Sequence, residues 1–171
     1  AGRHKASLER MKVQYQSQVD KKSMSTLYEM FPRGGSYNHA WNAPNTILSK
    51  HIAGVRPTKV AWSEFEIMPA LVHLQNIKKT IPTVKGNIDI EIHDSELEYQ
   101  LNLSSPKETE AIIGIPKTEK TIDKVYVNGK SVWSKGKMKK KAKFVEFEGE
   151  DENYLKLKIG SGVSEIKALY K

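Results

Sequence analysis

The chain has 171 residues, contains no cysteine and carries a formal net charge of +8. Its apolar fraction of 38% and charged fraction of 28% are ordinary for a folded protein, and a chain of this size can bury a core unaided. The lack of cysteine excludes a disulfide scaffold, a thiol nucleophile and a cysteine-based zinc site. No apolar run approaches the ~18 residues that a membrane-spanning helix needs, so no membrane contact is predicted.

The positive charge is concentrated in one segment. Residues 135–143 hold six lysines but no arginine and no aromatic residue. Proteins that read bases or stack on them rely on arginine and aromatic side chains. The segment therefore predicts a solvated loop between two strands, and no nucleic-acid partner is expected.

The first part of the chain has a helical pattern. Residues 5–20 are predicted to form a helix because their apolar positions fall on one stripe: Leu8, Met11, Tyr15 and Val19. A short helical turn is expected at Thr26–Phe31. A second long helix is expected to start at Asn42 and Pro44, which are typical of an N-cap and a first turn, and to end at Gly54.

From residue 62 onward the apolar residues alternate with polar ones. This period of two is typical of antiparallel strands with one face in a core. The dipeptide Asn128-Gly129 between two apolar runs predicts a hairpin. The other expected strands are residues 65–67, 88–92, 97–103, 110–115, 144–147, 154–159 and 163–169. About eight short strands predict a mainly β fold, an antiparallel β-sandwich.

Glu29 is the leading candidate for a catalytic residue, although the residues alone leave its role open. The spacing of Thr26 and Glu29 matches a capping box, in which the glutamate bonds a free N–H at the start of a helix. A nearby loop places His39 and Trp41 close to it in sequence. His39 is either a structural hydrogen-bonding residue or a contact to a sugar hydroxyl. Trp41 either packs in a core or offers a flat apolar face to a sugar ring.

The remaining titratable residues show no catalytic or metal-binding pattern. No pair of histidines has the spacing of a zinc motif, so neither a metal nor another cofactor is predicted. His51 lies on the apolar stripe of the second helix, which predicts a core histidine. Glu64 and Glu66 are expected on the polar face of a strand.

Several of these segments together resemble the bacterial α-L-rhamnosidases of glycoside hydrolase family seventy-eight. The end of that family's catalytic helical (α/α)6 barrel is similar to Thr26–Glu29, Gly34–Trp41 and Thr46–Pro57. The start of its C-terminal β-sandwich is similar to Trp62–Pro69 and Thr83–Gly86. The resemblance covers most of residues 5–117.

The resemblance implies a division of the chain and a set of site residues. Residues 1–57 would be two helices from the end of the barrel, and residues 58–171 would be the β-sandwich. Glu29 would be the general base of an inverting hydrolysis. The expected substrate-binding residues are Tyr28, Tyr37, His39 and Trp41. The proton-donating acid of the family lies upstream of this segment, so the chain alone is expected to be inactive.

The same resemblance implies the partners. One partner is a glycan or glycoside with terminal α-L-rhamnosyl groups, and the other is an upstream catalytic barrel. A periplasmic or extracellular location is favoured for the longer enzyme, and the compartment is otherwise open. The apolar stripe of the first helix would be exposed without the barrel and could support self-association. The alternative interpretation is a non-catalytic β-sandwich module that binds carbohydrate or protein.

Overall fold

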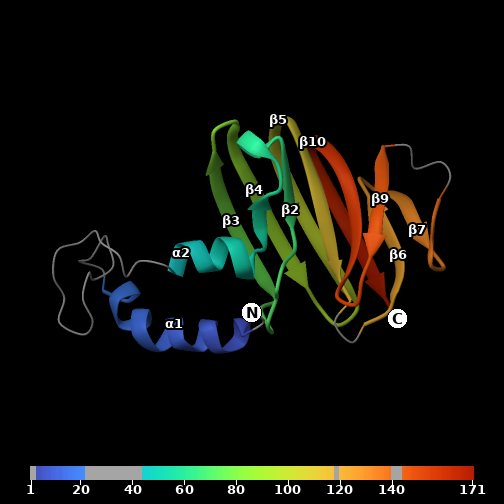
Figure 1. The fold of residues 1–171 in the computed structure, drawn as a ribbon. Coiled ribbons are helices and arrows are strands. Elements are labelled where there is room, and N and C mark those ends of the chain that lie inside the picture. The colour runs from blue at the N-terminus through green and yellow to red at the C-terminus, as the bar shows by residue number, and fades with distance from the viewer. Residues whose placement is uncertain (1–2, 22–43, 118–119, 140–143) are drawn as a thin grey trace.

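The computed structural model describes residues 3–21, 44–117, 120–139 and 144–171. Helices come first: α1 (His4–Val19), then α2 (Pro44–Ile47), which continues as one π-helical turn, η1 (Leu48–Ile52). The strands follow, with one 3-10 turn, η2 (Val60–Trp62), between the first two (Figure 1). They are β1 (Val55–Pro57), β2 (Glu64–Ile67), β3 (Asn76–Thr83), β4 (Gly86–Asp94), β5 (Glu98–Pro116), β6 (Ile122–Val127), β7 (Lys130–Ser134), β8 (Lys137–Met138), β9 (Val145–Glu150) and β10 (Tyr154–Tyr170).

The two helical segments lie side by side at one end of the strands (Figure 1). They run in opposite directions, since the start of α1 lies beside the end of η1: the ring centroids of His4 and His51 are 6.3 Å apart. The side chain of Lys79 in β3 donates a hydrogen bond to Asn45 in α2. Both predicted helices are confirmed where the chain is described, but the stripe of α1 ends early, since Val19 is 69% exposed. No helix among the described residues is long and apolar enough to cross a membrane.

Strands β5 and β10 form one long antiparallel ribbon that bends in the middle. They are paired from Tyr154↔Pro116 at one end to Leu169↔Glu98 at the other. Four residues of β5, 106–109, lie opposite the single residue Ser161 of β10, and such a bulge bends a strand pair. The sequence predicted four short strands here. The structure shows two long ones, because the pairing of β5 with β10 continues on both sides of the bulge.

The bent ribbon folds back on itself and makes two layers. The hydroxyl of Tyr170 donates to the carbonyl of Pro116 at 2.9 Å, which joins ends that would lie far apart in a straight ribbon. The first layer has the order β3-β4-β5-β10-β6-β7-β8, and the second has β1-β2-β5-β10-β9. Trp133 of the first layer stacks on Phe147 of the second, with ring centroids 5.5 Å apart. The predicted mainly β, antiparallel-dominated fold is confirmed, with ten strands in the described chain.

One apolar core lies between the layers. The first layer contributes Ile88, Ile90, Ile92, Tyr99, Leu101 and Leu103, and the second contributes Phe65, Ile67, Ile113, Ile115, Leu155 and Leu157, all of them buried. The alternation read from the sequence therefore identified the inward faces, except at Leu97, which is 73% exposed. The alternation missed β3, where Pro82 and two lysines weaken the pattern. A proline is tolerated there because, among the described residues, β3 is paired only with β4. The sequence also predicted a loop where the structure has the short strand β8.

Gly54 joins the helical segment to the sandwich through a close backbone contact. Met68 N donates to Gly54 O, and Ala70 N donates to Ile52 O, both at 3.0 Å. A Cβ atom on Gly54 would lie 2.0 Å from Met68 O. The φ of Gly54 is +73°, so an L side chain would be strained here even in open space. The joint requires glycine for two separate reasons.

A matched pair of variants separates these reasons. Gly136 also has a φ of +73°, but nothing lies within 4 Å of its added Cβ. We expect Gly136→Ala to cost about 1–2 kcal/mol in free energy of unfolding, the cost of the left-handed backbone alone. Gly54→Ala should cost roughly 2 kcal/mol more, because the backbone of Met68 must move. Urea unfolding followed by circular dichroism measures both; equal losses would contradict the close contact.

Candidate functional site

The five predicted site residues cannot be placed by the structure. Glu29, the expected general base, lies in the segment 22–43, outside the described residues, and so do the expected sugar contacts Tyr28, Tyr37, His39 and Trp41. Their roles stay predictions. The helices α1 and α2 that precede and follow this segment are described, and they lie next to each other (Figure 1).

A charged pocket of about 280 Å³ lies between the helices and the outer face of the second layer. The helices contribute His4, Lys50 and His51, and the layer contributes Arg56, Glu66, Met68, Ala70, Asp151, Tyr154 and Lys156. His51 is exposed, so its prediction as a core histidine is wrong. The predicted apolar stripe is correct at Ile52, which is buried, but it is wrong at the preceding residue, His51.

Ion pairs fill much of the charged pocket. Arg56 pairs with Glu66 at 2.6 Å, and Lys156 pairs with Asp151 at 2.5 Å. The hydrogen bond from Lys156, with those from the backbone N–H groups of Asn153 and Tyr154, lowers the pKa of Asp151 to about 2. Both carboxylates are therefore held as partners of cations. With its lowered pKa, Asp151 offers no proton for donation near neutral pH.

Glu64 is buried, contrary to its predicted place on a solvated face. Its side chain is 10% exposed and accepts hydrogen bonds from Thr58, Lys59 and Lys158, each at 2.9 Å. Lys59 and Lys158 are the main cause of a pKa lowered to about 2. Lys158 lies 94 residues further along the chain, so sequence spacing could not reveal the contact. Because three donors already bond this carboxylate, it has little capacity to take up a proton. Its role is therefore to stabilise the fold.

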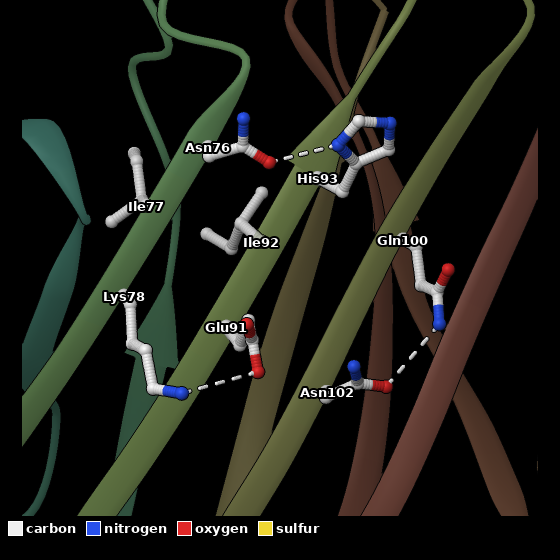
Figure 2. A pocket seen from close by; sticks show the side chains of 8 residues that line it. All are labelled: Asn76, Ile77, Lys78, Glu91, Ile92, His93, Gln100 and Asn102. Atoms are coloured by element: carbon white, nitrogen blue, oxygen red, sulfur yellow. Dashed lines mark hydrogen bonds and ion pairs between the residues drawn. The ribbon is translucent and has the colours of Figure 1, made fainter.

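The outer face of the first layer carries polar side chains in regular rows, and we call it the polar face. In one row the successive Cα partners across five strands are Asn76, His93, Gln100, Lys167 and Tyr126. In the next row they are Lys78, Glu91, Asn102 and Glu165. Figure 2 shows the part on β3, β4 and β5, where these residues line a pocket of about 140 Å³.

Side chains on the polar face contact one another between strands. The imidazole Nδ1 of His93 lies 2.9 Å from Asn76 Oδ1 (Figure 2). Gln100 Nε2 donates to Glu165 Oε1 at 3.1 Å, which connects β5 to β10. The face thus displays amide, imidazole and carboxylate groups, which provide donors and acceptors together. The sequence could not supply these neighbours, because β3 was missed and alternation gives the face of a residue but not its cross-strand partner.

A metal site is not formed by the described residues: nowhere in residues 3–21, 44–117, 120–139 and 144–171 do three or more His, Asp or Glu side chains gather closely enough to hold an ion.

Comparison with protein families identifies the middle of the chain. Residues 54–130 match the model of the bacterial α-L-rhamnosidase C-terminal domain. This stretch of the chain is similar to that domain. The match starts at the joint residue Gly54 and runs through β1 to the hairpin after β6, so it includes most of the first layer. A search of curated protein sequences gives no match.

Solved structures of α-L-rhamnosidases share the fold. The enzyme from Dictyoglumus thermophilum superposes with a TM-score of 0.56 at 24% identity over 69% of this chain. The Streptomyces avermitilis α-L-rhamnosidase, solved with L-rhamnose, gives 0.58 at 16% identity over 80% of this chain. The rhamnosidase resemblance read from the sequence is confirmed, and the protein is rhamnosidase-related. This chain spans 12% of the length of each enzyme.

The Glu64 carboxylate predicts a specific acid sensitivity. Its pKa is about 2 in the folded protein and 4.5 without these contacts, so its stabilisation is present above pH 4.5 and is lost as the pH falls towards 2. Glu64→Gln should lower the free energy of unfolding by roughly 1–3 kcal/mol at pH 7, the value for hydrogen bonds to charged groups. The loss should shrink below pH 4.5.

Glu110→Gln is the matched control. Glu110 contacts the same Lys158 at 3.0 Å, but it is 52% exposed, so a change of about 0.5 kcal/mol or less is expected. Thermal unfolding of both variants from pH 2 to 7 provides the comparison. If Glu64→Gln and Glu110→Gln shift the melting temperature equally at all pH values, the buried cluster does not stabilise the fold as argued.

Proposed function

We propose that this chain is the C-terminal part of a glycoside hydrolase that cleaves terminal α-L-rhamnosyl groups from glycans or glycosides. The observation that carries this proposal is the match of residues 54–130 to the rhamnosidase C-terminal domain. In the proposal, residues 1–57 belong to the catalytic barrel and residues 58–171 form the sandwich. Strand β1 lies at the join, where the backbone contact at Gly54 holds the two parts together.

Glu29 acts in this proposal as the general base of an inverting reaction. It takes a proton from a water molecule on one face of the sugar, while a carboxylic acid protonates the leaving oxygen on the other. In inverting enzymes these two carboxyl groups are ~6.5–9.5 Å apart, which leaves room for the water. The acid comes from the upstream barrel. The buried Glu64 and the paired Asp151 do not fit that role, because both have lowered pKa values.

The remaining site residues hold the sugar in this proposal. Trp41 offers its ring to the apolar face of the deoxyhexose, including the methyl group. His39 bonds a hydroxyl, and Tyr28 and Tyr37 line the same pocket. A site assembled from two parts of a longer protein explains why the chain by itself should have no activity: water activation without leaving-group protonation leaves the glycosidic bond intact.

The role of Glu29 can be tested in the longer enzyme. Glu29→Gln keeps the shape of the side chain but cannot accept a proton, so turnover of an aryl α-L-rhamnoside should fall roughly 10²–10⁴-fold. Rhamnose binding should change little.

Thr26→Ala is the control for the capping alternative. If Glu29 only caps a helix together with Thr26, both substitutions should cost about 1 kcal/mol of stability and leave turnover nearly intact. Turnover and melting temperature measured on the two variants distinguish the roles. Equal, small effects on turnover would overturn the assignment of the base.

The activity of the chain alone provides a second test. The purified chain of 171 residues should release no product from the same aryl α-L-rhamnoside. Hydrolysis that persists after purification and disappears in Glu29→Gln would show that the acid lies within this chain, against the proposal.

A further inference from the structure

The polar face continues beyond the pocket shown in Figure 2. A second pocket of about 320 Å³ lies on the same layer and is lined by Tyr126, Gly129, Glu165, Lys167 and Leu169. The hydrogen bond from Gln100 to Glu165 links the two pockets, because Gln100 lines the first and Glu165 lines the second. Asn76 and Tyr126 are four strand spacings apart, about 19 Å. The two pockets therefore form one path across the layer.

The path changes in character along its length. The end on β3 and β4 is polar, with the exposed side chains of Asn76, Glu91 and His93. The end on β6 and β10 is more apolar, since Tyr126 and Leu169 lie there half-buried. A sugar chain has the same two features: hydroxyl groups that donate and accept hydrogen bonds, and C–H faces that pack on apolar side chains.

Charge on the path is balanced, although the chain as a whole carries +8. The first pocket has one lysine and one carboxylate, Lys78 and Glu91, which pair at 3.7 Å. The second also has one of each, Glu165 and Lys167. A surface evolved for a polyanion would collect unpaired cations, and this one does not. The chemistry favours an uncharged ligand.

The existing contacts on the path do not prevent binding. Asn76, Lys78, Glu91 and His93 are exposed, so water already competes for their hydrogen bonds. A ligand hydroxyl can replace a side-chain partner at small cost. The backbone beneath is rigid, because β4, β5 and β10 are central strands paired on both sides.

From the geometry and charge of this path, we propose that the polar face binds an uncharged carbohydrate chain. The hydroxyls bond Asn76, His93, Gln100 and Asn102, and one sugar ring packs on Tyr126 and Leu169. This site is separate from the rhamnosidase site and uses none of its predicted residues. The inference does not rest on the catalytic proposal, because binding is measured on the chain whether or not the longer enzyme is a rhamnosidase.

Calorimetric titration of the chain tests the proposal with defined polymers. The probes are two neutral polysaccharides, a rhamnan and a galactan, and the anionic polygalacturonate, each at low and at raised salt. Binding to at least one neutral polymer, unchanged by salt, is expected. The double variant Gln100→Ala/Asn102→Ala and the single variant Tyr126→Ala should each raise the dissociation constant about tenfold or more, the loss expected from a few ordinary contacts.

Asn153→Ala is the matched control. Asn153 is an exposed amide in the turn between β9 and β10, away from the path, so this variant should bind like the unaltered chain. Circular dichroism verifies that all variants keep their strands.

Three results would overturn the proposal. The first is no binding to either neutral polymer. The second is binding to polygalacturonate alone that raised salt abolishes, which would reflect general lysine charge. The third is equal binding by all variants. If protein covers this face instead, neutral polymers will not bind, and Lys78 and Lys167 will resist amine labelling in the longer enzyme.

Discussion

The bent pairing of β5 with β10 is the constraint on which the rest of the structure depends. Each strand passes through both layers, so their register fixes the position of one layer relative to the other. The hydrogen bond from Tyr170 to Pro116 closes the fold at the far ends. The first half of β5 places Gln100 and Asn102 on the polar face, while the second half of the ribbon brings Lys158 to Glu64. Both features therefore come from one pair of strands.

The bend also explains the limits of the sequence-based prediction. The alternation of apolar and polar residues identified most of the core residues, because side-chain direction in a strand is a local property. It was wrong for Leu97, which is 73% exposed and lies just before β5. The sequence predicted breaks at residues 104–109 and 160–162, yet β5 and β10 continue through them. A local signal reports a change of backbone direction. Whether hydrogen bonding resumes with the same neighbour depends on a partner far away in sequence.

The candidate sites show the same limit in chemical terms. The environment of Glu64 comes from Lys158, 94 residues away, and the path on the polar face comes from five strands. None of these contacts can be predicted from a short stretch of sequence. The segment of Glu29 is the opposite case, since its residues lie within a short stretch and could be singled out by their composition and resemblance. Local motifs were accessible from sequence, whereas sites assembled across the sheet were not.

The two outer faces of the sandwich differ in a way that separates their roles. The outer face of the second layer meets the helices across the charged pocket, where Arg56 and Lys156 are paired with carboxylates. Residues of the helical segment line that pocket, but no described residue of that segment lines either pocket of the polar face. The second layer can thus hold the helical segment in place through Gly54 and Met68, while the first layer presents its rows of amides to solvent. In the proposed glycoside hydrolase this separation would be useful, because a sugar chain bound at the polar face would not compete with the one being cleaved, and its attachment would raise the local concentration of substrate.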